Sequence, residues 1–101
     1  MSVLPFPSRR SQRPAEPTLR EALGDVLRDE RHAQERTLAD VAAAAAVSVA
    51  YLSEVERGRK DVSSDVLTSI SGALDLPVPV LLERTARRMA VHGSGMFALA
   101  A

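Results

Sequence analysis

Apolar residues recur at three- and four-residue spacing from residue 18 onward, which is the period of an amphipathic α-helix. The first such segment runs from Thr18 to about Gln34, and its apolar positions are Leu19, Leu23, Val26, Leu27 and Ala33. A second helix is expected to begin at Thr37, with Asp40 three residues later as the partner in a capping box. Its apolar face carries Val41, Ala42 and Ala45.

Three more helices are predicted after the second. Only Ala46 and Val47 separate the second helix from Ser48. Ser48 is a good N-cap for a third helix from Val49 to about Arg57, which Gly58 ends. So short a link predicts a steep crossing that leaves the third helix protruding. Ser63 or Ser64 should cap the fourth, which packs through Leu67, Ile70 and Leu74. The fifth begins at Pro77 or Pro79 and carries Val78, Leu81, Leu82, Ala86 and Met89.

No segment has the two-residue period of a strand, so the predicted fold class is all-α with five helices. The expected organisation is a folded domain over residues 18–92 between two irregular ends. Residues 1–17 are rich in proline and arginine and predict a disordered basic arm, which either lies along DNA or is a solvated tail. Gly93 and Gly95 predict a flexible tail over residues 93–101.

Composition excludes several classes of protein. With 101 residues, 46% of them hydrophobic, the chain suffices for one domain with its own core. No run approaches the roughly 18 apolar residues of a membrane span, and the N-terminus lacks a secretory pattern, so we expect a cytoplasmic bacterial protein. The chain has no Cys, its two His are isolated and its carboxylates are scattered, so we expect no metal, no cofactor and no enzyme activity.

Net charge is zero, but it is unevenly distributed. Residues 21–79 hold six basic and eleven acidic groups, a balance of −5, whereas both ends are basic. An acidic middle weighs against binding of nucleic acid. Phosphate binding depends on local lysine and arginine, however, so the cluster Arg57, Arg59 and Lys60 matters more than the total.

The stretch from Thr37 to Lys60, TLADVAAAAAVSVAYLSEVERGRK, resembles the helix-turn-helix of the phage-repressor-like (XRE) regulators, and residues 19–82 follow that family as a whole. Within it, VSVAYLSEVERGRKDVSS is most similar to the actinobacterial regulators of Clp protease genes. The resemblance implies a five-helix, lambda-repressor-like domain that binds an operator in double-stranded DNA and activates Clp protease genes. Ala46 and Glu35 stand where the family commonly has glycine.

The third helix is the expected reading helix. With Leu52 and Val55 buried, its free face carries Val49, Ala50, Ser53 and Glu54. The resemblance places base-edge contacts at Val49, Ala50 and Glu54. Apolar side chains suit thymine methyl groups and a carboxylate accepts from cytosine N4. An ordinary core position remains the alternative for Val49.

Phosphate contacts are expected around the same helix. Ser48 leaves the early N–H groups pointing outward, and we place Thr37 in the phosphate set with it. Arg57, Arg59 and Lys60 match the loop that the family lays against the DNA backbone, although a solvated charge run is the alternative. Tyr51 either reaches a phosphate or packs at the edge of the core. Arg31 and Glu56 match a structural ion pair of the family.

A homodimer is expected because one such domain reads only a few base pairs and the last helix has more apolar positions than a small core uses. The interface candidates are Val80, Leu82, Met89 and Val91. The operator would then be an inverted repeat, and RNA polymerase would be a further partner. The competing hypothesis is an antitoxin or adaptor module that keeps the fold but binds protein, which the acidic middle favours.

The chain ends in Ala98, Leu99, Ala100 and Ala101. These four residues are identical to the end of the tag that bacteria add to stalled polypeptides to direct them to Clp proteases. We therefore expect a degradation signal that makes Clp protease a partner, with an inert frayed terminus as the alternative.

Overall fold

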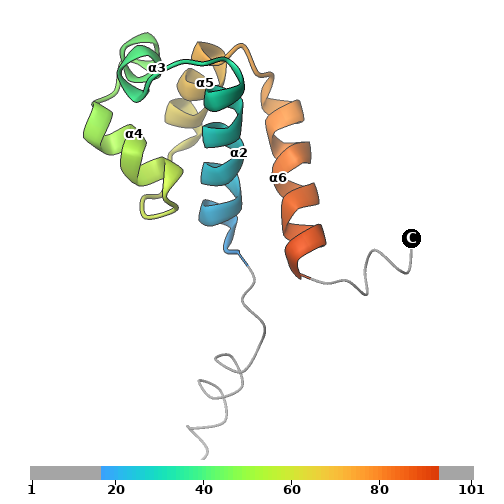
Figure 1. Cartoon of the computed structure of the whole chain (residues 1–101). Helices are drawn as coiled ribbons and strands as arrows, with labels where there is room; N and C mark the ends of the chain where they lie inside the picture. Colours follow the sequence, from blue (N-terminus) through green and yellow to red (C-terminus); the bar gives the residue numbers. More distant parts are fainter. Residues whose placement is uncertain (1–16, 94–101) are drawn as a thin grey trace, which may run out of the picture.

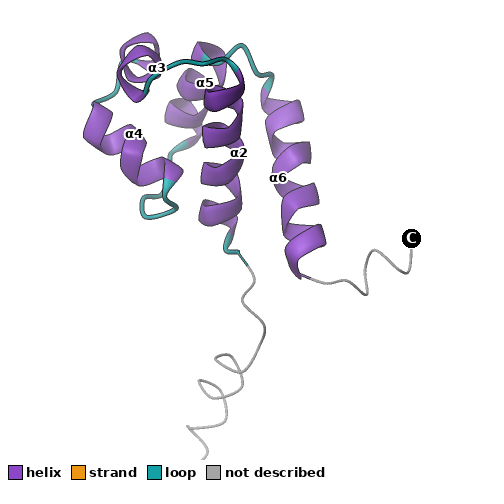
Figure 2. Ribbon diagram, viewed as in Figure 1, coloured by secondary structure: helices purple, strands orange, loops and turns teal. Residues whose placement is uncertain are grey.

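The computed structural model describes residues 17–93, which form five helices and, within that range, no strand (Figures 1 and 2). The helices are α2 (Leu19–Ala33), α3 (Leu38–Ala45), α4 (Val49–Glu56), α5 (Ser64–Ala73) and α6 (Val78–Gly93). All five predicted helices are therefore present. The predicted arm and tail lie outside the described residues, apart from Pro17 and Gly93.

Hydroxyl side chains start four of the helices. Thr18 and Thr37 each form a full capping box, with Glu21 and Asp40 respectively, and so satisfy two backbone N–H groups per helix. The hydrogen bonds from Thr37 lower the pKa of Asp40. Ser48 accepts from the N–H of Tyr51. At α5 the cap is Ser63, which settles the choice between the two serines.

A single core joins the five helices, and its buried side chains come from every one of them. Its largest fully buried members are Leu27, Leu52, Ile70, Leu74 and Leu81. Helix α2 packs between α4 on one side and α6 on the other, while α3 packs on α4 and α5 (Figure 1).

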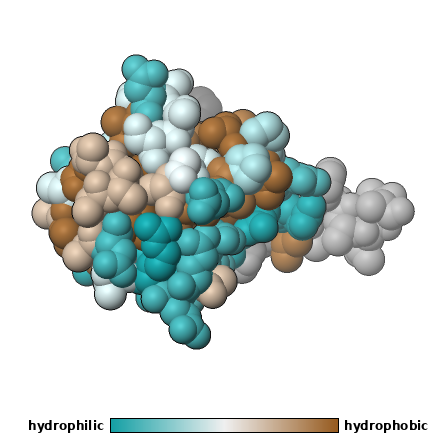
Figure 3. Space-filling view, turned by 90° about the horizontal axis from the view of Figure 1, so that it is seen from above, coloured by the Kyte–Doolittle hydropathy of each residue, from teal (hydrophilic) through white to brown (hydrophobic). Residues whose placement is uncertain are grey.

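Several residues that the period assigned to core stripes are exposed. Leu19 is 61% exposed, and Ala33 and Ala86 are exposed too. Leu19 and Ala33 are the end residues of α2, where the neighbouring helices no longer cover it. Within the alanine run, Ala42 and Ala45 pack inward, whereas Ala43 and Ala44 face solvent. Figure 3 accordingly shows a lightly hydrophobic surface on the side where α3 lies.

Three residues with side chains adopt left-handed backbone conformations in the links between helices. They are Glu35, Ala46 and Asp75, with φ of 55°, 59° and 53°. Glycine is expected at Glu35 and Ala46 from the family resemblance, and the left-handed φ values there are strained for a residue with a Cβ atom.

Gly24 brings α2 and α4 into backbone contact. A Cβ atom on Gly24 would lie 2.6 Å from the carbonyl oxygen of Glu56 and closer still to that of Val55. No side chain fits at that point, so the absence of one lets the end of α4 lie directly against α2. No local pattern indicates this contact, because it joins residues more than thirty positions apart.

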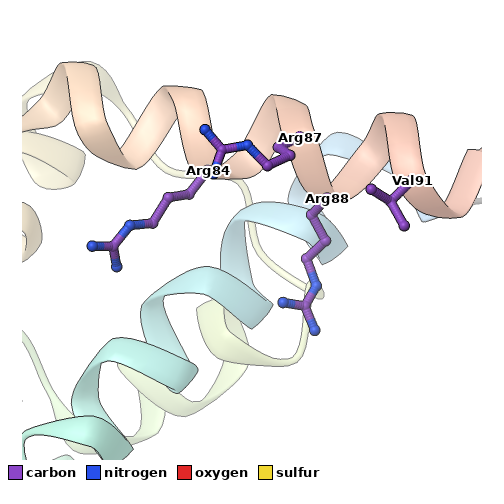
Figure 4. Close-up of a pocket in the computed structure, with 4 residues that line it drawn as sticks. All are labelled: Arg84, Arg87, Arg88 and Val91. Atoms are coloured by element: carbon purple, nitrogen blue, oxygen red, sulfur yellow. The ribbon is translucent and has the colours of Figure 1, made fainter. Parts of the chain in front are cut away.

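A row of ion pairs joins α2 to α6. Arg84 lies 2.7 Å from Glu30, and Arg88 lies 2.9 Å from Asp29 and 3.3 Å from Asp25. Figure 4 shows Arg84 and Arg88 extending from α6 on the same side as α2. Hydrogen bonds from Gln34 and then Arg84 lower the pKa of Glu30. We call these five charged residues the α2–α6 ion-pair row.

Within residues 17–93 no single helix has the length and apolar composition to cross a membrane, although two bent helix pairs meet that criterion jointly.

Candidate nucleic-acid interface

Helix α4 protrudes with one side free. It follows α3 after a bend of 108°, and Leu52 and Val55 fix it to the core. Its free face carries all four predicted base-reading positions. Val49 is 45% exposed, Ala50 is exposed, and Ser53 and Glu54 are half-buried. The exposure of Val49 removes the alternative that it is an ordinary core residue.

The start of α4 leaves backbone donors available. The first N–H groups of an α-helix have no acceptor within it. The Ser48 hydroxyl accepts only from the N–H of Tyr51, at 3.0 Å. The N–H groups of Val49 and Ala50 therefore lie at the exposed, positive end of the helix dipole. Thr37 occupies the equivalent position on α3, exposed and with its hydroxyl engaged by the N–H of Asp40.

A basic loop follows α4. Gly58, at φ 74°, turns the chain, and the N–H of Arg59 closes the helix end by donating to the carbonyl of Glu54 at 2.9 Å. Arg57, Arg59 and Lys60 are exposed, and none of them forms an ion pair with another residue in the range 17–93. Their charges are therefore available to a ligand.

Tyr51 packs its ring against the edge of the core. Its hydroxyl donates to the backbone carbonyl of Asp61 at 3.2 Å, which ties α4 to the loop that follows it. Of the two roles left open for this residue, the structure contains the packing one. A phosphate contact by Tyr51 would require this hydrogen bond to be exchanged.

The predicted pair of Arg31 and Glu56 is present and buried. Arg31 donates to both carboxylate oxygens, at 2.8 and 2.9 Å, and its third donor group reaches the carbonyl of Arg36 at 2.9 Å. The bond to Glu56 raises the pKa of Arg31. Both side chains are at most one-tenth exposed, so removing either one would leave a buried charge without its partner. The pair anchors the end of α4 to α2.

The four candidate interface residues of α6 do not share one face. At about 100° per residue, Leu82 and Met89 fall together, whereas Val80 and Val91 fall together on the opposite flank. Val80 is half-buried against the core, and Val91 lines a hollow with Arg84, Arg87 and Arg88 (Figure 4). The four candidates therefore form two separate surfaces, and an interface at either of them stays a prediction.

Arg28 is a basic residue that the sequence reasoning did not select. It lies on α2, exposed, and lines a cleft between α2 and α4. The lining residues of this α2–α4 cleft are Arg28, Arg31, His32, Leu38, Ser53, Glu56 and Arg57. Because Arg28 and Arg57 are far apart along the chain, only the packing of the two helices brings them to one site.

The sequence profile described as a helix-turn-helix domain matches residues 22–91, which include all of this geometry. The chain belongs to the helix-turn-helix domain family. This helix-turn-helix domain is 53% identical over 72 residues to the transcriptional regulator ClgR of Mycobacterium tuberculosis, covering 71% of the chain. It is 42% identical over 61 residues, 60% of the chain, to the HTH-type transcriptional regulator DdrOP3 of Deinococcus deserti. The chain spans 64% and 47% of the lengths of these two relatives.

Solved structures agree with this assignment of the helix-turn-helix domain. The clp gene regulator ClgR of Corynebacterium glutamicum superposes with a TM-score of 0.72 at 50% identity, covering 75% of this chain and 97% of that one. The restriction-modification controller protein C.Esp1396I shares the fold, with a TM-score of 0.70 at 22% identity. The predicted all-α fold and the resemblance to regulators of Clp protease genes are thus confirmed.

Proposed function

We propose that this helix-turn-helix domain is a transcription regulator that binds a specific operator in double-stranded DNA. One observation carries the proposal: the free face of α4 lies directly beside basic side chains that form no ion pair with the described residues. A protruding helix of this size fits the major groove, where Val49, Ala50 and Glu54 can meet base edges. Arg57, Arg59 and Lys60 then meet the phosphates that flank the groove.

The operator-binding form is proposed to be a homodimer on an inverted repeat. One reading helix covers only a few base pairs, and a two-fold axis doubles the site. The half-sites would lie about 34 Å apart, one turn of DNA. Leu82, 50% exposed, and Met89 on the same face of α6 are the candidates for the contact.

The proposed targets are Clp protease genes, and the proposed effect is activation. This assignment is supported by similarity to two proteins whose names contain ClgR, one of them described as a clp gene regulator. Activation would make RNA polymerase a second partner, and the bacterial cytoplasm is where such a regulator meets its operator. The four residues of the predicted degradation signal, and with them a direct contact with Clp protease, lie outside the described residues.

A protein-interaction module is the competing function, and the observation that favours it is the apolar start of the α4 free face. Val49 and Ala50 are exposed there without a charged neighbour at positions 47 to 53. An exposed apolar surface of this kind can also bind another protein. DNA binding falls steeply with salt because counterions are released, whereas apolar protein contacts do not follow that law.

The deciding experiment measures binding to the promoter of the chain's own gene by fluorescence anisotropy over a range of salt. We predict that Arg59→Ala weakens binding about equally on all sequences and lowers the salt slope by roughly 1. Glu54→Gln should instead change the preferred base at one position of each half-site. Uniform weakening by Glu54→Gln would remove this residue from base reading, and salt-independent binding would favour the protein-interaction function.

A further inference from the structure

We propose that the α2–α4 cleft seats one phosphate of the DNA backbone, held by Arg28 from α2 and Arg57 from α4. This inference rests on the proposed function and deepens it, because it makes α2 a DNA-contacting element. Arg28 lies outside the motif from Thr37 to Lys60, and no sequence argument pointed to it.

The position of the cleft supports this assignment. Its lining includes Ser53 of the α4 free face and Leu38, the first residue of α3. The cleft thus continues the surface on which base edges are expected. A duplex docked on α4 passes its backbone over this point, since phosphates border the major groove on both sides. A site adjoining the reading face meets the backbone rather than the bases.

The charges in the cleft favour an anion. Glu56 is the one carboxylate among its lining residues, and both its oxygens are engaged by Arg31. The charges of Arg31 and Glu56 therefore cancel each other inside the cleft. Arg28 and Arg57 remain, both exposed and neither in an ion pair with another described residue. Two guanidinium groups from different helices on one hollow are suited to a phosphate, which each can bind in a bidentate manner.

The neighbouring hollow along the same two helices is electrostatically different. It shares Arg28, Glu56 and Arg57 and adds Arg59 together with the carboxylates of Glu21 and Asp25, so three arginines there face three carboxylates. Those two groups have structural partners, since Glu21 completes the cap of α2 and Asp25 pairs with Arg88. Their charge nevertheless cancels that of the arginines, whereas the α2–α4 cleft has three arginines and one carboxylate. The phosphate is therefore placed at the Ser53 end of the groove.

A second arginine-rich hollow, on α6, provides a contrast. Arg84, Arg87 and Arg88 line it with Val91 (Figure 4). Each of these arginines already pairs with a carboxylate: Arg87 with Glu83 at 3.1 Å, and the others with α2. An anion at that hollow would have to displace an existing pair. The arginines of the α2–α4 cleft differ from these because Arg28 and Arg57 have no carboxylate partner among the described residues.

The test combines protein variants that each lack one arginine charge with DNA in which single phosphates are replaced by uncharged methylphosphonates. Arg28→Gln and Arg57→Gln are compared with wild type and with Arg87→Gln, an exposed control that loses the same charge. We expect Arg28→Gln to weaken binding to the promoter duplex by about fivefold at 0.15 M salt and to lower the salt slope by about 0.9. Arg87→Gln should match wild type in both. Circular dichroism and thermal melting check that each variant keeps the fold.

Methylphosphonate substitutions, one at a time along the duplex, then identify the phosphate. The expected result is one position per half-site that weakens binding of wild type but has no further effect on Arg28→Gln or Arg57→Gln. If Arg28→Gln retains the wild-type slope and phosphonate pattern while wild type binds DNA, the cleft assignment is wrong and the proposed function stands. If Arg28→Gln and Arg57→Gln lose sensitivity to methylphosphonates at different positions, the two arginines do not bind the same phosphate. If wild type shows no salt-dependent binding to DNA, both proposals fail.

Discussion

Three residues with side chains, Glu35, Ala46 and Asp75, adopt left-handed conformations in the links between helices. Ala46 caps the end of α3 and, with Val47, separates α3 from Ser48, the cap of α4. A left-handed conformation costs a residue with a Cβ roughly 1 to 2 kcal/mol relative to its right-handed form. The position of α4 is therefore maintained against local strain by its packing on α3 and the rest of the core.

We predict that Ala46→Gly raises the free energy of unfolding by about 1 kcal/mol, because glycine adopts φ near 59° without strain. Urea denaturation measures the change. Ala44→Gly, at an exposed position inside α3, is the matched control and should lower stability by about 1 kcal/mol. A loss of stability in both variants would show that Ala46 is not strained.

Among elements, local signals were sufficient for the helices and insufficient for their contacts. Ser48, Ser63 and the two threonine caps are read from neighbouring residues, so the predicted helix boundaries agree with the structure to within a few residues. Contacts between residues of different helices cannot be read in this way. The backbone contact at Gly24 and the meeting of Arg28 with Arg57 depend on how α2 packs on α4, which no local period encodes.

Gly24→Ala should lower the free energy of unfolding by about 2 kcal/mol or more, since its Cβ would collide with the carbonyl of Glu56 at 2.6 Å. Gly72→Ala is the control. Gly72 lies in α5, where an added Cβ would meet no atom within 4 Å, so alanine there should stabilise the domain by roughly 0.5 to 1 kcal/mol. Stabilisation by both substitutions would mean that α2 and α4 are not in backbone contact.

The ion pair of Glu30 with Arg84 should make the attachment of α6 sensitive to acid. The pKa of Glu30 is lowered in the folded state, so its contribution is present above the ordinary pKa of a glutamate, about 4.3, and is lost as pH falls through the lowered value. We predict that Arg84→Gln moves the NMR titration of Glu30 upward and that Arg87→Gln does not. An unchanged titration in Arg84→Gln would show that the bond of 2.7 Å does not persist in solution.

Across the whole molecule, the acidic middle segment has structural uses that its net charge conceals. Of the eleven acidic residues between positions 21 and 79, five form ion pairs: Asp25, Asp29, Glu30, Glu56 and Asp61. Glu21 and Asp40 complete capping boxes. Of the five basic residues in this segment without an ion pair to a described residue, Arg36 donates to the carbonyl of Ala73, and the other four lie around the end of α4: Arg28, Arg57, Arg59 and Lys60. The segment charge that weighed against a nucleic-acid ligand is thus concentrated in contacts that hold the fold together.

The two faces of α6 make separate predictions for assembly. Leu82→Glu and Met89→Glu should convert the proposed dimer to monomer in sedimentation experiments at micromolar protein, because they place charge on the proposed contact. Val91→Glu, on the opposite flank and 63% exposed, should leave the dimer intact. The reverse pattern would move the interface to the flank of Val91, and a wild-type monomer that stays monomeric on its operator would contradict the dimer altogether.

Helix α4 is fixed to α2 twice, by the buried pair of Arg31 with Glu56 and by the backbone contact at Gly24. For a domain that binds DNA as proposed, a reading helix already rigid in the free protein leaves little ordering to occur on association. The heat-capacity change of binding should then reflect the contact surface alone, without a contribution from coupled folding. The DNA duplex then has to deform to fit the protein, so base pairs that the protein never touches will influence affinity through their stiffness.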